Sequence, residues 1–103
     1  VPKLELIDGT VPDVLDGLEA PDAIFIGGGL SIKTFETCWS ALRPLGRLVV
    51  NAVTLESEAV LLILYAKYGG DLVRIQVSRA DTIGRVNGWR PSMPVTQWSL
   101  IKR

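Results

Sequence analysis

Three consecutive glycines, Gly27, Gly28 and Gly29, follow the apolar run Ala23–Ile26 and precede Ser31. The run is typical of a parallel strand buried on both faces, and Ser31 is a favourable N-cap for a helix. Ligands of open α/β sheets bind beyond the carboxyl ends of strands, where glycines let them approach the backbone and a helix start can hold an anion. A crossover that needs positive φ angles and binds nothing explains the glycines about as well. The segment is not GxGxxG, so it does not indicate a nicotinamide site.

A second candidate, Asp8-Gly9-Thr10, follows the short apolar run Leu4–Ile7. We expect it at the same edge of the sheet, where a carboxylate and backbone amides could meet a ligand. An Asx turn into the next segment is the simpler explanation, and composition alone favours it.

Asn51 interrupts the apolar strand predicted over residues 48–53. A buried amide costs free energy unless it finds hydrogen-bond partners, so Asn51 is a candidate for facing a ligand crevice. The nearby acids Glu56 and Glu58 fall in the first turn of a predicted helix, where the helix dipole favours negative charge. They need no functional explanation.

The segment 79–91 concentrates Arg79, Arg85, Arg90 and Trp89, in or just before a loop that we expect over residues 81–92. Arginine pairs with carboxylates in a bidentate manner, and tryptophan offers a flat apolar face. The combination suits a large, planar ligand that carries several carboxylates. For any one of these residues, a solvated basic loop with its tryptophan folded onto the core is the more economical explanation.

These candidates require a framework of alternating strands and helices. Apolar residues at helical spacing, Ile32, Phe35, Trp39 and Leu42, predict a helix after Ser31, and Thr54 is expected to cap another. The predicted elements are strand 4–7, a short helix 12–18, strand 23–26, a helix from 32, strand 48–53, helix 55–68, strand 73–77 and strand 95–101. This order predicts an α/β fold with a mainly parallel sheet that ends in an antiparallel hairpin.

Composition excludes several classes of function. The 103 residues are 48% hydrophobic and balance 11 Lys and Arg against 11 Asp and Glu, which argues against nucleic-acid and membrane partners. With no histidine and one cysteine, we expect no metal site and no Ser-His-Asp or Cys-His nucleophile. No apolar run is long enough to span a bilayer and no signal peptide is visible, so we expect a cytoplasmic protein.

Three stretches together resemble the C-terminal methyltransferase domain of the precorrin-6Y C5,15-methyltransferase (decarboxylating) family of cobalamin biosynthesis. They are PDAIFIGGG from residue 21, GRLVVNAVTLESE from residue 46 and WRPSMPVTQW from residue 89. The resemblance implies a Rossmann-like class I S-adenosylmethionine-dependent methyltransferase fold. It also implies methylation at C15 of a precorrin tetrapyrrole and decarboxylation of an acetate side chain.

The same resemblance implies roles for the candidate residues. The cofactor S-adenosyl-L-methionine would lie against two segments, Asp8-Gly9-Thr10 and Gly27-Gly28-Gly29. The tetrapyrrole substrate would face four residues: Asn51, Arg79, Trp89 and Arg90. Catalytic acid–base residues are not identified.

One departure from the family pattern is large. The glycine-rich first motif and the acid after the second strand are absent, so residues 1–103 are interpreted as the C-terminal part of one methyltransferase domain, inactive alone. In the family the first strand lies beside the fourth, so its loss is expected to separate residues 1–18 from the sheet. The exposed strand edges favour a homo-oligomer. A methyltransferase for another small molecule and a noncatalytic α/β ligand-binding or assembly module remain the alternatives.

Overall fold

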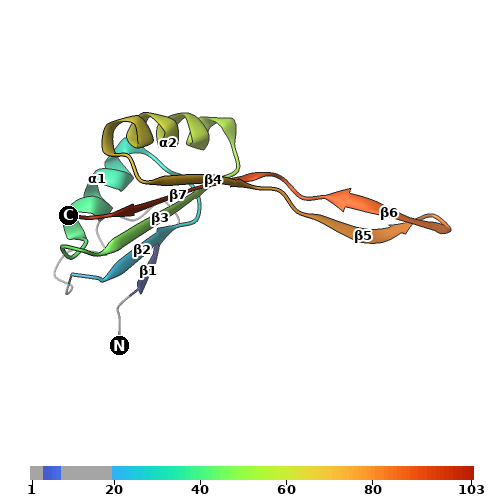
Figure 1. Cartoon of the computed structure of the whole chain (residues 1–103), viewed down its shortest axis with the longest axis horizontal. Helices are drawn as coiled ribbons and strands as arrows, with labels where there is room; N and C mark the ends of the chain where they lie inside the picture. The colour runs from blue at the N-terminus through green and yellow to red at the C-terminus, as the bar shows by residue number, and fades with distance from the viewer. Residues whose placement is uncertain (1–3, 8–19) are drawn as a thin grey trace.

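The computed structural model describes residues 4–7 and 20–103, and in that part of the chain it forms a five-stranded sheet covered by two helices, with a long two-stranded ribbon (Figure 1). The sheet order is β1-β2-β3-β7-β4. The elements are β1 (Leu4–Ile7), β2 (Ala23–Ile26), α1 (Ile32–Ala41), β3 (Arg47–Ala52), α2 (Leu55–Tyr68), β4 (Asp71–Ile75), β5 (Ser78–Ile83), β6 (Val86–Pro91) and β7 (Val95–Ile101).

The central strands form as their apolar runs predict. β1 pairs with β2 and β2 with β3 in parallel, whereas β7 lies antiparallel between β3 and β4. Four strands of this sheet therefore run in one direction and β7 alone is reversed. The predicted α/β fold with an antiparallel ending is confirmed, although β7 separates β4 from β3.

Both helices begin at the predicted caps. The Ser31 side chain accepts a hydrogen bond from the Thr34 amide at 3.0 Å, and Thr54 accepts one from the Ser57 amide at 3.1 Å. Each bond satisfies an amide that has no partner inside its helix. At the other end, α2 stops at Gly69, whose φ of 74° breaks the helical path.

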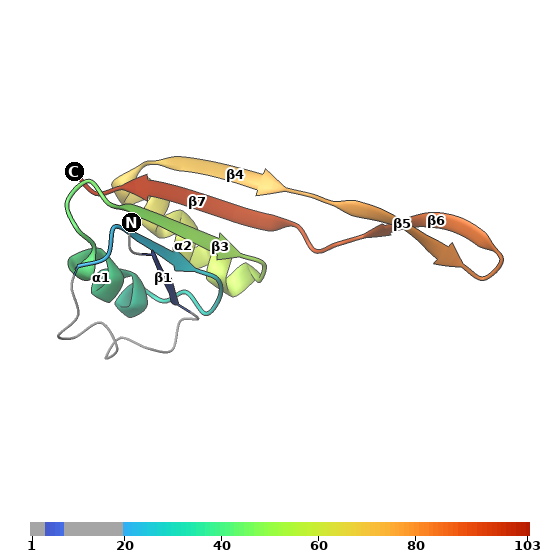
Figure 2. The same ribbon diagram turned by 90° about the horizontal axis from the view of Figure 1, so that it is seen from below.

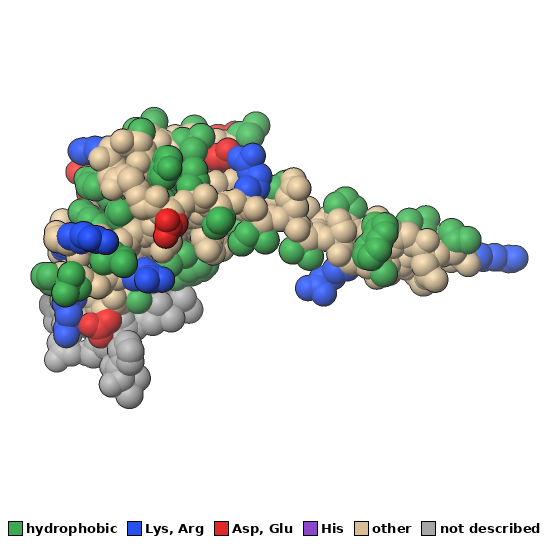
Figure 3. Space-filling model, viewed as in Figure 1, with side chains coloured by type: hydrophobic (Ala, Val, Ile, Leu, Met, Phe, Trp, Pro, Cys, Tyr) green, Lys and Arg blue, Asp and Glu red, His purple; other side chains and the backbone are tan. Residues whose placement is uncertain are grey.

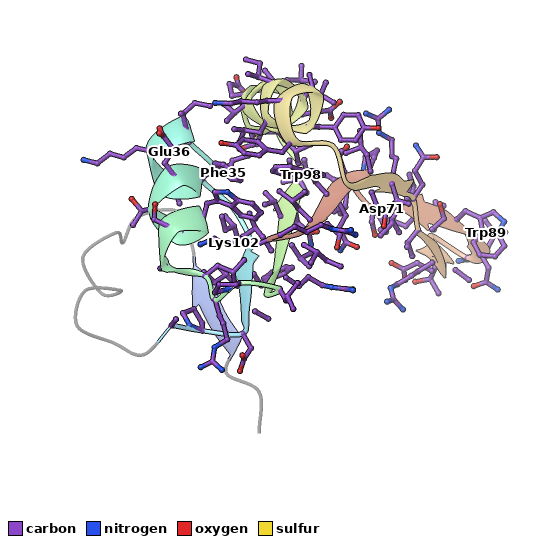
Figure 4. All side chains as sticks on the ribbon, turned by 60° about the vertical axis from the view of Figure 1, so that its left-hand side comes forward. Phe35, Glu36, Asp71, Trp89, Trp98 and Lys102 are labelled. Atoms are coloured by element: carbon purple, nitrogen blue, oxygen red, sulfur yellow. The ribbon has the colours of Figure 1, made fainter. Side chains whose placement is uncertain are left out.

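An aromatic cluster joins the two helices to the sheet. The Phe35 ring of α1 lies 5.0 Å from Tyr68 of α2 and 5.6 Å from Trp98 of β7, centroid to centroid. Figure 4 shows Phe35 and Trp98 facing one another between helix and sheet. Both helices therefore cover the sheet face toward which Trp98 points. The predicted stripe on α1 is buried at Phe35 and Leu42 and half-buried at Trp39, but Ile32 is exposed.

The first strand corrects one expectation. Instead of standing apart from the sheet, Leu4–Ile7 pairs with Ala23–Ile26 over four residues. A free edge of β2 presents unpaired backbone groups, and a nearby extended segment satisfies them. The short helix expected over residues 12–18 lies outside the described residues.

The segment 81–92 corrects a second expectation, because it is not a loop. Ser78–Ile83 and Val86–Pro91 pair as an antiparallel ribbon, and a glycine at φ 62°, Gly84, stands in the two-residue turn. The preceding strand also starts earlier than expected, at Asp71 rather than Val73. Figure 2 shows the ribbon continuing from β4 and β7 away from the body, and it accounts for the longest dimension of 56 Å.

Candidate functional site

The carboxyl ends of β2 and β3 place the glycines and Asn51 together. Ile26 is the register partner of Val50, so the residues that follow them, Gly27 and Asn51, lie at the same edge of the sheet. β1 ends level with Ile26 at this edge as well. Asp8, Gly9 and Thr10 lie outside the described residues. We call this end of the sheet, where Gly27 and Asn51 lie next to one another, the carboxyl edge.

The three glycines differ in what the fold requires of them. Only Gly29 has a positive φ, 65°, which disfavours any residue with a Cβ. At Gly28 an added Cβ would meet no atom within 4 Å, and at Gly27 it would approach the Phe25 ring at 3.3 Å. The backbone conformation of the crossover therefore explains the glycine at position 29. The fold does not require a glycine at position 28.

Asn51 has a hydrogen-bond partner on a neighbouring strand. Its Oδ1 accepts a hydrogen bond from Gln97 Nε2 at 3.0 Å, between register partners of β3 and β7. Because Val50 is fully buried beneath the helices, the alternation of a strand turns Asn51 toward the opposite face. The Asn51 Nδ2 group donates no hydrogen bond within the described residues, which leaves a donor available at the carboxyl edge.

The ribbon positions the other predicted residues. Arg79 and Arg90 are register partners, so their side chains leave the same face, and Trp89 is paired with Ala80 on the opposite face. Arg90 Nε lies 2.9 Å from Asp81 Oδ2. Trp89 is 73% exposed, so the alternative that folded it onto the core is wrong.

The ribbon leaves the body at the carboxyl edge. The pairing of β4 with β7 ends at Ile75 and Val95. Val95 is next to Thr96, which pairs with Ala52 at the carboxyl end of β3. Figures 1 and 2 show the ribbon projecting in the direction in which β2 and β3 point. In Figure 3 basic side chains stand below its base and at its tip, with apolar side chains between them. The glycines, Asn51 and the ribbon thus share one end of the molecule.

An ion-pair network was missed by sequence reasoning. Glu58 Oε1 lies 2.7 Å from Arg74 Nη2, and Glu58 Oε2 accepts a hydrogen bond from the Thr96 hydroxyl at 3.2 Å. The network ties the first turn of α2 to β4 and β7, where both strands enter the ribbon. The one feature of the sequence that could have indicated this network is Thr96, a polar residue on the buried face of β7.

The opposite edge of the sheet holds a cleft of about 480 Å³. It lies where β3 and β4 begin and β7 ends, so it is separate from the carboxyl edge. The residues that line it are Trp39, Arg47, Tyr68, Gly70, Asp71, Ser99, Leu100, Ile101 and Arg103.

Residues 4–7 and 20–103 contain no group of three or more metal-ligating side chains. Nor is either helix long and apolar enough to cross a membrane.

Comparisons with known proteins identify relatives of this chain. A family model described as a precorrin methyltransferase domain matches residues 1–102. The precorrin-6Y C(5,15)-methyltransferase (decarboxylating) of a Sinorhizobium species is 53% identical over 103 residues, which are 99% of this chain and 25% of that protein. The chain therefore spans about a quarter of the length of this curated relative.

Solved structures of other proteins also resemble this chain. The C-terminal domain of precorrin-6Y C5,15-methyltransferase from Rhodobacter capsulatus superimposes with a TM-score of 0.83 at 47% identity, covering 91% of this chain and 51% of that one. A SAM-dependent O-methyltransferase from Thermotoga maritima matches with a TM-score of 0.51 at 15% identity, covering 88% of this chain and 38% of that one. The second likeness shows the fold alone.

Proposed function

This chain belongs to the precorrin methyltransferase domain family, and from that premise we propose that it supplies one part of a precorrin-6Y C5,15-methyltransferase (decarboxylating). The activity is S-adenosylmethionine-dependent methylation of the tetrapyrrole at C15, together with decarboxylation of its acetate side chain. The curated relative named for this activity aligns with the chain over nearly its whole length, which supports the proposal.

One structural observation carries the assignment of the site: Gly27 and Asn51 lie side by side at the carboxyl ends of parallel strands. Ligands of open α/β sheets bind at this edge. The ribbon that bears Arg79 and Arg90 leaves the sheet at the same end. The glycine segment and the ribbon can therefore contact a cofactor and a substrate that lie in one crevice.

We assign cofactor binding to Gly27, Gly28 and Gly29, and to Asp8, Gly9 and Thr10 by the family resemblance. The open space beside Gly28 fits this role, because a ligand can approach the backbone there without displacing protein atoms. When bound, S-adenosyl-L-methionine would supply the methyl group from its sulfonium. Because they have no side chains, the glycines would keep the backbone N–H groups accessible. Close approach of the cofactor to this backbone would exclude water from the crevice.

We assign substrate binding to Asn51, Arg79, Trp89 and Arg90. Within the described part of the chain Arg79 has no ion-pair partner, so its guanidinium can pair with a peripheral carboxylate of the tetrapyrrole. The free amide donor of Asn51 can orient the ring edge nearest the cofactor. Trp89, on the other face of the ribbon, would contact the substrate only if the macrocycle or a second molecule wraps that face. Few acid–base groups are required, since methyl transfer depends mainly on alignment.

We further propose a homo-oligomer located in the cytoplasm. β1 and β4 form the two edges of the described sheet, and several apolar side chains on the ribbon are exposed, Ile83, Val86 and Trp89 among them. Exposed edges and apolar patches of this kind favour association.

Calorimetric titration of S-adenosylhomocysteine tests the cofactor assignment. We expect binding by the full gene product and weak or no binding by residues 1–103 alone, because the family's glycine-rich first motif is absent from this chain. Binding by neither protein would overturn the methyltransferase proposal.

A reaction assay tests the chemistry. The full gene product is incubated with a precorrin-6Y-type tetrapyrrole and S-adenosylmethionine, and the products are followed by mass spectrometry. We expect replacement of hydrogen by methyl together with loss of carbon dioxide. Methylation of unrelated small molecules but not of the tetrapyrrole would favour a different substrate.

A further inference from the structure

Gln97 lies beside Asn51 on the face of the sheet opposite the two helices. Its neighbours along β7, Thr96 and Trp98, are buried on the helix side, where Thr96 contacts Glu58 of α2. The alternation of the strand therefore turns Gln97 to the other face. Asn51 is its register partner on β3, and both residues are half-buried. The two side-chain amides thus lie next to one another where β3 approaches the carboxyl edge.

The contact between the two amides has a direction. Gln97 Nε2 donates a hydrogen bond to Asn51 Oδ1 at 3.0 Å. An amide carries its acceptor oxygen and its donor nitrogen on one carbon, so a bond that holds the oxygen toward β7 turns the nitrogen away from β7. The neighbour of β3 on that other side is β2, which is followed there by Gly27. Since a glycine has no side chain, the Asn51 Nδ2 group faces a position that a ligand can occupy.

Gln97 has no other side-chain partner in residues 4–7 and 20–103. Its register partner on β4 is Val73, which has no group that can form a hydrogen bond. The side chain of Gln97 is therefore committed to Asn51. Without this contact the Asn51 amide could turn over, and its oxygen rather than its nitrogen would face the ligand.

We propose that Gln97 is a positioning residue, which holds the Asn51 amide so that Nδ2 donates a hydrogen bond to a peripheral carboxylate of the tetrapyrrole. The inference rests on the proposed function, because it requires Asn51 to contact the substrate. An ionised carboxylate accepts hydrogen bonds and cannot donate one. Only the orientation that Gln97 imposes on Asn51 can therefore bind it, although Gln97 itself does not touch the substrate.

Two substitutions of Gln97 test the orientation in the full gene product. In Gln97→Glu the side chain keeps its length but only accepts, so Asn51 must donate to it and present Oδ1 to the substrate. In Gln97→Met the strong hydrogen bond is lost and the amide can adopt either orientation. We expect the KM for the tetrapyrrole to rise about tenfold in Gln97→Glu and about threefold in Gln97→Met. The kcat and the affinity for S-adenosylhomocysteine should stay nearly unchanged.

A purely structural role of Gln97 predicts the opposite order of the two variants. Gln97→Glu keeps a hydrogen bond to Asn51, now between an amide donor and a carboxylate, whereas Gln97→Met has none. In urea denaturation Gln97→Glu should therefore be at least as stable as Gln97→Met. A higher KM in Gln97→Met than in Gln97→Glu would overturn the proposal, and so would the parental KM in both variants.

Ser99→Glu controls for the negative charge that Gln97→Glu adds. Ser99 lies two positions from Gln97 on the same face of β7 and is also half-buried. Its carboxylate cannot turn over the Asn51 amide, so we expect the KM to rise less than about twofold. An equal rise in the two variants would show that the charge alone acts, and the positioning role of Gln97 would be wrong.

Asn51→Asp separates this inference from the proposed function. The new carboxylate still accepts the hydrogen bond from Gln97 but has no donor for the substrate, so the KM should rise as it does in Gln97→Glu. A parental KM in Asn51→Asp would show that Asn51 does not bind the substrate, and this inference would fall while the methyltransferase activity stands. If the parent protein itself does not methylate the tetrapyrrole, the proposed function fails and the inference falls with it.

Discussion

Gln97 Nε2 donates a hydrogen bond to Asn51 Oδ1 at 3.0 Å, across the antiparallel pair of β3 and β7. The bond connects a strand that ends at the carboxyl edge to a strand that arrives from the ribbon. Asn51, which we assign to the substrate, is thereby fixed to the strand that returns from the ribbon, and its amide nitrogen stays free.

Removing this contact should cost stability. We expect Asn51→Ala to lower the free energy of unfolding by about 1 kcal/mol, since a half-buried amide loses its partner. Urea denaturation measures the change, and Asn87→Ala on the exposed ribbon is the control. In a double-mutant cycle with Gln97→Ala the two losses should not add. Full additivity would mean that the bond contributes nothing in solution.

Gly28→Val should separate cofactor binding from folding. A Cβ at this position meets no protein atom, so the melting temperature should change little. The dissociation constant for S-adenosylhomocysteine, measured by calorimetry on the full gene product, should rise more than about tenfold because the side chain enters the space of the ligand. Gly28→Ala should have a smaller effect. An unchanged affinity in both variants would remove Gly28 from the cofactor site.

Arg90→Ala should weaken substrate binding and spare the cofactor. The ion pair with Asp81 is exposed and contributes little to stability, so the ribbon should keep its structure. We expect the KM for the tetrapyrrole to rise about tenfold through loss of a carboxylate contact, with an unchanged affinity for S-adenosylhomocysteine. Arg85→Ala, at the ribbon turn, is the control. Equal effects of the two substitutions would indicate a general charge effect only.

Cys38 should be unreactive in the folded protein and should make stability decline at high pH. It is 1% exposed, and burial raises the pKa of its thiol to about 11 from an ordinary value of 9.0. The folded state therefore holds the proton more tightly than the unfolded state. The resulting stability is present below pH 9 and is lost as the pH rises toward 11, by about 2 to 3 kcal/mol.

A thiol-specific reagent and a substitution check this prediction. At pH 8 the reagent should label the native protein far more slowly than the protein in urea. In Cys38→Ala the part of the alkaline stability loss that comes from the thiol should disappear. Rapid labelling of the native state would show that the thiol is accessible.

The sequence alone determined the elements whose signals are local. Ser31 and Thr54 start their helices by hydrogen bonds to residues three positions away, and apolar runs form β2 and β3 because both strands bury side chains. The glycine segment was correctly expected to follow a parallel strand, and Asn51 to lie near the carboxyl end of another, since strand direction follows from right-handed crossovers. The family match was visible at this level as well.

Tertiary structure decided which strands pair and which faces the side chains occupy. Residues 81–92 carry too few apolar residues to signal a strand, and the ribbon forms through backbone hydrogen bonds between segments that the sequence pattern does not connect. Pairing also places Arg79 with Arg90 and turns Trp89 away from both. Only the assembled sheet brings Glu58, Arg74 and Thr96 together, because their contacts span up to 38 positions and depend on β7 entering between β3 and β4.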